Sequence, residues 1–314
     1  MRVAAHHARS ELGQCNFDAA SLYPYRGTAI SKGESILKMA RLLECALNFS
    51  EGRRQDVIQA IVAAAQDVRV LDVSSDRDHN RTVLTFVGSP EAAAEAAFRV
   101  SAKAVELIDM NQHHGAHPRM GAVDVIPFVP LGDASMEEAI ATARQLGQRL
   151  GKELGIPVYL YEEAAARSER RNLADVRQGE YEGLAQKLAD PQWMPDFGPA
   201  HPHPTAGATA VGARIYLVAY NVNLDTADVE IARKIARALR AKSGGLHNVK
   251  ALGVMLQERN LAQVSMNVTD PFHTPLYRVL ELVRLEAARY GVAVVGSEIV
   301  GLVPLSVLVE TVRY

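Results

Sequence analysis

The stretch RTVLTFVGSPEAAAEAA, residues 81–97, joins a strand pattern to a helix pattern and decides the fold. Its first seven residues are rich in β-branched and aromatic side chains, which favour a strand. Ser89 is placed to cap the helix that follows. Pro90 takes the first helical position, where a missing N–H is not needed. The helix is expected to continue to about Ile108.

The residues around this stretch complete a split β-α-β pattern. Residues 42–48 and 68–73 predict two strands, and the apolar residues between them recur at helical spacing. Residues 123–129 predict a fourth strand, so the first half has the order β-α-β-β-α-β of a ferredoxin-like unit. A helix over residues 135–154 and a short strand over residues 158–161 extend this half.

The second half repeats this order, although no residue-level repeat is visible. We expect strands at residues 214–223, 249–257, 261–268 and 292–296, and helices at residues 226–242 and 275–290. The sequence therefore predicts an α+β fold of two ferredoxin-like subdomains, residues 39–213 and 214–314, with a long Pro/Gly-rich loop between them.

The segment between the halves, residues 173–212, is first polar and then rich in structure breakers. Residues 177–188 predict one or two polar helices. Residues 195–207 contain four prolines and two glycines, which exclude regular structure. A long ordered loop of this kind is either a linker or a segment that contacts a ligand, and its composition does not choose between them.

The two ends of the chain differ in character. Residues 1–38 lack both periodicity and an apolar signal core, so we expect a poorly structured extension, with Met39 as the candidate start. The alternative is a short arm that packs on a partner subunit. Residues 291–312 are the most apolar stretch. Polar and helix-breaking residues interrupt it, so it predicts a buried strand and a short helix instead of a membrane span.

The composition narrows the functional class. The chain has 34 basic and 36 acidic residues, a net charge of −2, and therefore no electrostatic footprint for nucleic acid. Its two cysteines, Cys15 and Cys45, form neither a disulfide framework nor a zinc knuckle, which favours a reducing, cytoplasmic setting. With 314 residues, the chain can bury a sizeable core without such staples.

The segment DMNQHHGAHPRMGAVD, residues 109–124, concentrates the side chains that carry chemistry. It holds three histidines and an arginine, and it ends on an aspartate. Gly115, Pro118 and Gly121 keep it from forming a helix, and Pro118 restricts the residue before it to extended geometry. The segment is therefore expected to be a loop that presents side chains at fixed points.

Two chemical interpretations of these histidines compete with a purely structural one. His113 and His117 are four residues apart, but no acidic or cysteine ligand follows at a recognised spacing, so we expect no metal. A histidine beside an arginine, without a catalytic cysteine or serine motif, favours acid–base chemistry on an anionic substrate. On composition alone, histidines that only hydrogen-bond the loop explain the pattern almost equally well.

From residue 42 to residue 314 the chain resembles the glutamate formiminotransferase family. The matching motifs are CALNFSEGR (45–53), NRTVLTFVGSPE (80–91), LIDMNQHHGAHPRMGAVDVIPFVP (107–130), GIPVYLYEEAA (155–165), PDFGP (195–199), GARIYLVAYNVNL (212–224), NLAQVSMN (260–267) and VVGSEIVGLVP (294–304). The resemblance implies two ferredoxin-like subdomains, folate bound between them, a role in histidine breakdown and a homodimer. Animal members carry a cyclodeaminase domain after this one, and we expect its activity to be absent here.

The resemblance also implies the reaction and its main residues. A formimino group would move between N-formimino-L-glutamate and tetrahydrofolate, the co-substrate, with His117 as general base and acid. The family's folate-contacting loop corresponds to Gly198, Pro199, Ala200, His201, Pro202, His203, Pro204, Thr205, Ala206 and Gly207. In this loop an aromatic-containing stretch of the animal members is replaced by histidines and prolines.

Five more residues are expected to contact the substrate or to support the base: Arg119, Asn80, Arg81, Asp124 and Asn267. Arg119 is the expected partner of a substrate carboxylate, because a guanidinium binds carboxylate in bidentate fashion. Asp124 is expected to orient the imidazole or to stabilise positive charge, the alternative being a cap at a strand start. Asn267 is expected to meet the pterin edge.

Three other functions stay open at this level. A formyl group could be transferred between 5-formyltetrahydrofolate and glutamate by the same histidine. The protein could bind folate without catalysis, although His117 and Arg119 argue against this. A metal-dependent hydrolase built on the histidines is the third. Small molecules, and neither nucleic acid nor membrane, are the expected partners.

Overall fold

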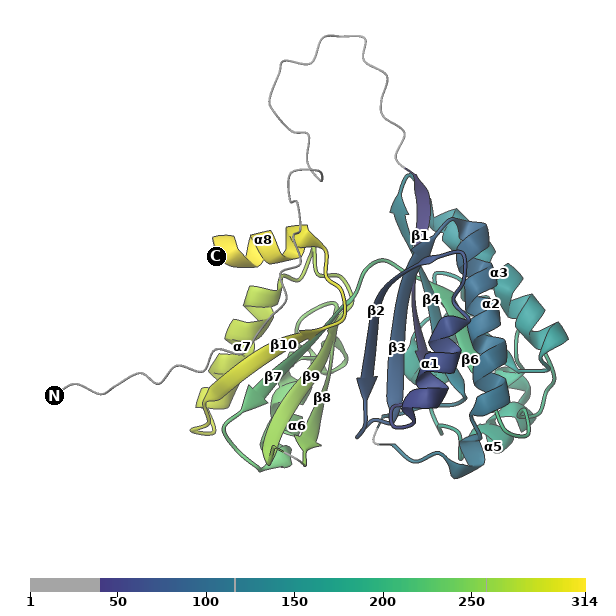
Figure 1. Cartoon of the computed structure of the whole chain (residues 1–314). Helices are drawn as coiled ribbons and strands as arrows, with labels where there is room; N and C mark the ends of the chain where they lie inside the picture. The colour runs from purple at the N-terminus through teal and green to yellow at the C-terminus, as the bar shows by residue number, and fades with distance from the viewer. Residues whose placement is uncertain (1–39, 116, 258) are drawn as a thin grey trace, which may run out of the picture. The chain divides into compact units, whose positions relative to one another are not determined.

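The computed structural model describes residues 40–115, 117–257 and 259–314 (Figure 1). The predictions for residues 1–38 and for Met39 lie outside the described residues. The strands are β1 (Arg41–Phe49), β2 (Arg69–Asp76), β3 (Arg81–Gly88), β4 (Val123–Gly132), β5 (Val158–Glu162), β6 (Thr209–Ala213), β7 (Val218–Leu224), β8 (Val249–Leu256), β9 (Leu261–Val268) and β10 (Val294–Val300). The α-helices are α1 (Gln55–Ala63), α2 (Pro90–Leu107), α3 (Met136–Glu153), α4 (Leu173–Val176), α5 (Leu184–Ala189), α6 (Val229–Leu239), α7 (Leu276–Ala288) and α8 (Leu305–Arg313). The short 3₁₀ helices are η2 (Met110–Gln112), η3 (Ser168–Arg170), η4 (Pro191–Trp193) and η5 (Ala241–Ser243).

The first sheet has the strand order β2-β3-β1-β4-β6-β5. Its first four strands are antiparallel neighbours in the order expected of a ferredoxin-like unit, which confirms that prediction. The turn into α2 also forms as expected. The Ser89 hydroxyl accepts a hydrogen bond from the Ala92 amide at 3.2 Å, and Pro90 is the first residue of the helix.

Strand β6 was not predicted, because only one or two helices over residues 177–188 and an irregular stretch over residues 195–207 were expected between the halves. β6 pairs parallel with both β4 and β5, and all five of its residues are buried. A strand covered on both faces needs no alternation of polar and apolar residues. Small side chains here suit close packing, since a Cβ on Gly212 would lie 2.5 Å from the Tyr161 ring.

Two cores lie on opposite faces of this sheet. Val158 and Leu160 of β5 belong to the main core, together with residues of α2 and α3, whereas Tyr159 and Tyr161 belong to the core on the other face. There they pack with Val176, Leu184 and Leu188 of the segment that contains α4 and α5. Of the one or two polar helices expected over residues 177–188, only α5 forms in that range, because residues 177–183 are a turn and α4 ends before them. The apolar residues of the segment hold it against the sheet.

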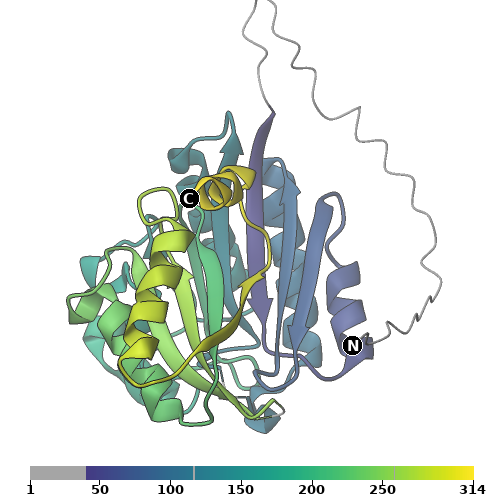
Figure 2. The same ribbon diagram turned by 90° about the vertical axis from the view of Figure 1, so that its left-hand side faces the viewer.

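The second sheet has the order β10-β7-β9-β8, again ferredoxin-like, with α6 and α7 on one face (Figure 2). The predicted strand over residues 214–223 is wrong at its start, because β7 begins at Val218. Helix α6 begins later than predicted, since the Asp228 side chain caps it by accepting from the Glu230 amide. The described chain is thus mixed α+β with two sheets.

The C-terminal elements have the predicted types but not the predicted burial. β10 and α8 are the strand and the short helix that were expected here. Much of their apolar surface is exposed, whereas the strand was expected to be buried. Val307 is the buried residue of α8, while Val312 is 85% exposed. No helix among the described residues is both long and apolar enough to cross a membrane.

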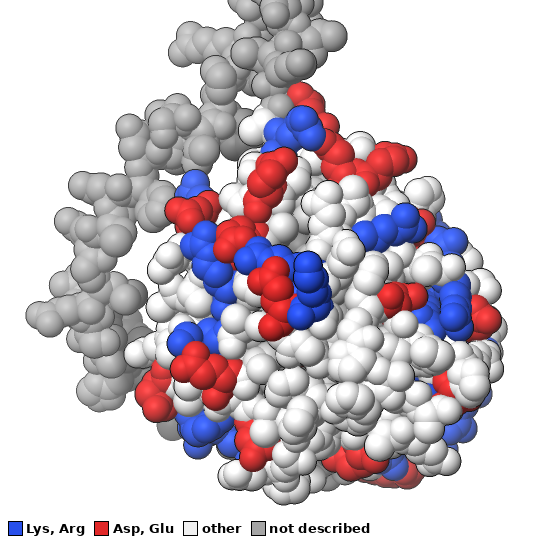
Figure 3. All heavy atoms as spheres, turned by 90° about the vertical axis from the view of Figure 1, so that its right-hand side faces the viewer, with Lys and Arg blue, Asp and Glu red and all other residues white. Residues whose placement is uncertain are grey.

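Charges of both signs mix on the face shown in Figure 3. Ion pairs also join charges of opposite sign on the outer helices, where Glu95 of α2 pairs with Arg149 of α3 and with Arg99. No broad area of one sign is visible on this face, in keeping with the nearly balanced charge of the chain.

Candidate active site

The histidine segment lies against the turn between β2 and β3. The Asn80 side chain accepts a hydrogen bond from the Gly52 amide at 2.9 Å and donates one to the carbonyl of His114 at 3.1 Å. Gly115 passes so close that a Cβ there would lie 2.2 Å from the carbonyl oxygen of His79. Asn80 therefore holds three loops together and has both ends of its amide engaged.

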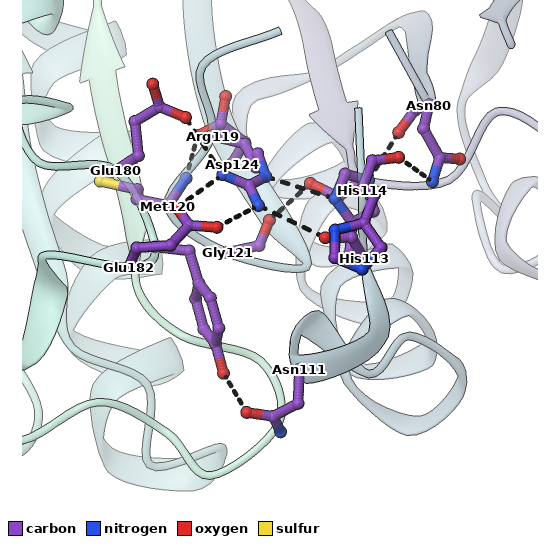
Figure 4. A network of polar contacts seen from close by, with 12 residues as sticks. Asn80, Asn111, His113, His114, Arg119, Met120, Gly121, Asp124, Glu180 and Glu182 are labelled. Atoms are coloured by element: carbon purple, nitrogen blue, oxygen red, sulfur yellow. Dashed lines mark hydrogen bonds and ion pairs between the residues drawn. The ribbon is translucent and has the colours of Figure 1, made fainter. Parts of the chain in front are cut away.

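Arg119 is buried at the centre of a polar network (Figure 4). Its Nε–H donates to Nδ1 of His113 at 3.3 Å, and His113 Nε2–H donates to the Asn80 carbonyl at 2.9 Å. Its terminal nitrogens donate to Glu182 at 2.6 and 2.9 Å, to Glu180 at 3.0 Å and to the carbonyl of His113. All five N–H groups of the guanidinium have partners.

Hydrogen bonding within this network stabilises the charged forms. The bond to Glu182 is the first cause that raises the pKa of Arg119, and the bond to Arg119 lowers the pKa of the Glu182 carboxyl. Burial lowers the pKa of His113, in line with its role as a neutral link. Arg119 was expected to bind a substrate carboxylate, which would have to displace Glu182. This assignment stays a prediction, and the pairing of Arg119 with Glu182 does not favour it.

His117 contacts a different arginine. Nη1 of Arg81 lies 2.5 Å from Nε2 of His117, and Nδ1 of His117 lies 2.7 Å from the carbonyl oxygen of Pro118. Because a guanidinium and a carbonyl can only donate and accept respectively, Nδ1 carries the proton and Nε2 presents its lone pair to Arg81. The His79 ring approaches edge-on, with the ring centroids 5.7 Å apart.

These neighbours strongly disfavour the imidazolium form. Burial, followed by the charges of Arg81 and Arg177, lowers the pKa of His117 to about 2. Burial and Arg177 also lower the pKa of Arg81, to about 10. Within the described residues, no carboxylate lies within 4.0 Å of the Arg81 guanidinium, so this cation has no ion-pair partner of its own.

Asp124 is fully buried and does not contact His117. Its carboxylate pairs with Arg177, through Nη2 and through Nε at 3.3 Å, and accepts from the Met120 amide at 3.1 Å. The expected direct orientation of the imidazole by Asp124 is therefore wrong for this geometry. Asp124 instead holds Arg177, one of the two cations whose charge lowers the pKa of His117.

The expected folate loop runs beside the histidine segment. The carbonyl of Thr205 accepts from the Met110 amide at 2.7 Å, and the carbonyl of Ala206 accepts from the Ala122 amide at 2.9 Å. Gly207 has φ +69° and forms a β-bridge with Gly121. The tertiary structure thus brings together residues that are 84 to 95 positions apart in the sequence.

Within this loop, the two histidines differ. Nδ1 of His203 accepts from the amides of Thr205 and Ala206 at 3.3 and 3.0 Å, so this ring caps its own turn, and burial lowers its pKa. His201 is exposed. His203 therefore has a structural task, whereas Nδ1 of the exposed His201 lies 3.2 Å from the carbonyl oxygen of its neighbour Pro202.

Two neighbouring pockets border the histidine segment. One of about 480 Å³ is lined by His114, Gly115, Arg119, Gly179, Glu180 and Glu182. The other, of about 330 Å³, is lined by Met110, Asn111, His113, His114, Tyr181, Glu182, Ala185 and Pro202. Both pockets share His114 and Glu182, and the second reaches the folate loop through Pro202.

The structure brings together most of the residues that the sequence singled out. Asn267, exposed on β9, has no polar contact with the histidine segment in the part of the chain that the structure describes. The sequence analysis missed Arg177, Glu180, Glu182 and the approach of His79. Arg177, Glu180 and Glu182 lie in a polar segment whose sequence is typical of a solvated surface. Only the apolar residues of that segment, which are buried against the sheet, indicate that it packs inward.

No metal-binding group is visible among the described residues: they contain no cluster of three or more His, Cys, Asp or Glu side chains arranged to hold an ion. The histidines are instead engaged with arginines and backbone carbonyls. The geometry therefore offers a neutral imidazole flanked by cations, which suits proton transfer on an anionic substrate.

The depressed pKa of His117 predicts a pH dependence of stability. A group whose pKa falls from 6.5 to about 2 on folding binds fewer protons in the folded state, so its contribution to stability is complete above pH 6.5 and is lost as the pH falls below that value. Between pH 7 and pH 5, the free energy of unfolding should fall less in His117→Ala than in the unchanged protein. Urea unfolding at both pH values measures this. Arg278→Met, which removes an exposed arginine that stays charged throughout this pH range, should retain the full slope.

Comparisons with known proteins show the family of the chain. The model "Formiminotransferase domain, N-terminal subdomain" matches residues 42–214, and "Formiminotransferase domain" matches residues 219–314. The chain is 51% identical to the glutamate formimidoyltransferase of Streptococcus pyogenes, over 88% of this chain and 93% of that protein. For the enzyme of the same name from Thermoplasma acidophilum, the identity is 52%, over 87% and 91%. The formimidoyltransferase-cyclodeaminase of Gallus gallus is 47% identical, over 88% of this chain and 52% of its own length. The chain therefore belongs to the formiminotransferase family.

Proposed function

We propose that this protein is a glutamate formimidoyltransferase, which moves a formimino group between N-formimino-L-glutamate and tetrahydrofolate. The observation that carries the proposal is the identity of 51% and 52% to enzymes of that name over nearly their whole length. A histidine flanked by arginines, as His117 is here, supports it. Tetrahydrofolate is the co-substrate, which places the protein in one-carbon and histidine metabolism.

His117 is the proton carrier in this proposal. N5 of tetrahydrofolate attacks the formimino carbon, the new C–N bond forms, and N5 loses its proton to Nε2 of the imidazole. As the tetrahedral intermediate collapses, the bond to the glutamate nitrogen breaks and Nε2 returns the proton to that nitrogen. One group serves both steps because it is neutral at the start and at the end.

The folate contacts are proposed for residues 198–207. The hydrogen bonds of this loop to the histidine segment, and the exposure of His201, support the assignment. Hydrogen–deuterium exchange with and without tetrahydrofolate tests it. Slower exchange in this loop is the expected result, and unchanged exchange at saturating folate would remove the loop from the binding site.

The decisive experiment is an assay of the purified protein with two donors. We expect N-formimino-L-glutamate to be consumed only when tetrahydrofolate is present, with free glutamate released in equal amount. In a parallel arm, 5-formyltetrahydrofolate is offered with glutamate. Faster transfer of the formyl group than of the formimino group would replace the proposed reaction. Folate binding without turnover of either donor would leave a non-catalytic binding protein.

We also propose a cytoplasmic homodimer. Exposed apolar residues near the C-terminus support the dimer, because such residues are common at subunit contacts. They are Val295, Leu302, Leu305, Leu308, Val309, Val312 and Tyr314. Cys45, buried and without a disulfide, fits a reducing compartment. Light scattering should give twice the mass of the chain, and localisation of the tagged protein tests the compartment.

A further inference from the structure

We propose that the contact between Arg81 and His117 is a latch, which the α-carboxylate of the amino-acid substrate opens. In the free protein, Arg81 occupies the Nε2 lone pair that must accept the proton. When the carboxylate binds the guanidinium, Nε2 becomes available. This inference rests on the proposed function, because it concerns the base of that reaction.

The first observation is that the base is occupied. Nε2 of His117 lies 2.5 Å from Nη1 of Arg81, and Nδ1 is engaged by the Pro118 carbonyl. Neither ring nitrogen can receive a proton from a substrate while both contacts last. A general base needs to be within hydrogen-bond reach of the proton that it takes. The contact with Arg81 must therefore open before catalysis.

The second observation is the missing counter-ion of Arg81. The other cation beside His117, Arg177, is paired with Asp124. Within the described ranges, Arg81 has no carboxylate at ion-pair distance, and an imidazole lone pair takes only one of its five N–H groups. Cations that are mostly removed from water are normally paired with an anion. A guanidinium with free donors matches a carboxylate in bidentate geometry, so Arg81 has the properties of a carboxylate receptor.

The surroundings of His117 explain why an anion would change its basicity. It is faced by Arg81 from β3, by His79 from the β2–β3 turn and by Arg177 after α4, with Asp124 of β4 behind Arg177. Asp76, at the end of β2, is a second carboxylate that acts on Arg81, but the charges that lower the pKa of His117 itself are those of the cations. A bound carboxylate would offset the charge of Arg81 and so reduce the part of the penalty for protonating the imidazole that comes from the cations, while the larger part, from burial, stays.

The chemistry of the substrate selects the α-carboxylate. In N-formimino-L-glutamate, the reacting nitrogen and the α-carboxylate are attached to the same carbon. A carboxylate held by Arg81 therefore places the leaving nitrogen next to His117, whereas the distal carboxylate is too far along the chain to do both. The latch would thus allow Nε2 of His117 to accept a proton only when an α-amino acid derivative is bound.

The test is the titration of His117 by NMR, with the resonance assigned from its absence in His117→Gln. We expect no protonation above pH 5 in the free protein. With saturating N-acetyl-L-glutamate, an uncharged-nitrogen mimic of the substrate, the pKa should rise toward the ordinary value of about 6.5. N-acetyl-4-aminobutanoate, which lacks the α-carboxylate, should leave the titration unchanged. Ordinary titration in the free protein, or no change at saturating N-acetyl-L-glutamate, overturns the proposal.

Two variants separate the latch from a general loss of positive charge. Arg81→Met should raise the pKa of His117 without any ligand and should abolish its response to N-acetyl-L-glutamate. Arg278→Met, which removes an exposed arginine on α7, should behave like the unchanged protein. If Arg81→Met titrates like the unchanged protein, Arg81 does not control the imidazole.

Kinetics gives an independent reading that needs no mimic. The pH profile of kcat/KM reports the free protein, and that of kcat reports the substrate complex. The latch predicts that kcat falls at acidic pH with a higher apparent pKa than kcat/KM for formiminoglutamate, and in Arg81→Met the two apparent pKa values should agree. Identical profiles in the unchanged protein contradict the latch. Turnover with identical pH profiles would support the proposed function and reject the latch. A pKa of His117 that responds to N-acetyl-L-glutamate, without any turnover, would support the latch and reject the proposed function.

Discussion

Replacing His117 with alanine should lower kcat by about 10²–10⁴-fold, because a positioned general acid–base group contributes about that factor. The loss should fall mainly on kcat. The His117 side chain takes part in the proton transfer, whereas the folate contacts are proposed for the loop at residues 198–207. Steady-state kinetics with N-formimino-L-glutamate and tetrahydrofolate measures both constants.

The matched control for this variant is His273→Ala. That imidazole is 82% exposed and pairs with Asp270 on the surface, so its loss should leave kcat unchanged within about twofold. A His117→Ala protein with near-normal turnover would assign the proton transfer to another group. A large rise in the KM for folate with normal kcat would place His117 in binding and not in catalysis.

The second large effect concerns stability. Asp124→Ala should lower the free energy of unfolding by about 3 kcal/mol, the low end of the range for breaking a buried ion pair. The carboxylate is fully buried, while Arg177 keeps 16% of its side chain exposed and can recover some hydration. The Met120 amide also loses its acceptor. Urea unfolding followed by circular dichroism at pH 7 measures the change.

Glu230→Ala is the control for an ion pair in water. Its partner Arg233 and Glu230 itself are 54% and 58% exposed, so the loss should be at most about 1 kcal/mol. Should Asp124→Ala fail to fold, Asp124→Asn keeps the shape and one acceptor and allows the measurement. A loss for either Asp124 variant no larger than that of the control would show that the buried pair contributes little.

The sequence predicted the framework because its signals are local. The capped turn at Ser89 and Pro90 and the regular spacing of apolar residues indicate strand and helix wherever one face meets the core. β6 lacked such a signal, since a strand buried on both faces shows no alternation. β10 and α8 had the right pattern, but burial depends on what packs against an element, and no local rule contains that.

The candidate site shows the same division. The family resemblance selected His117 and the loop at residues 198–207, and a position at a strand entry suggested Arg81; all of them lie on or beside the histidine segment. The patterns did not indicate that Arg81 faces His117, or that Arg119 is taken by Glu182. These contacts join side chains 36 and 63 residues apart, so they depend on how the strands and the helical segment pack.

The sequence by itself determined the order of strands and helices, the loop character of the histidine segment and the family of the chain. These depend on neighbouring residues, on backbone restrictions at glycine and proline, and on motifs that can be recognised in the linear sequence. Only the tertiary structure decided the electrostatics of the site. It packed Arg177 beside His117, left Arg81 without a carboxylate and enclosed Asp124. The low proton affinity of His117 follows from burial and from these charges, because an imidazole that is away from water and near two cations cannot easily become a cation itself.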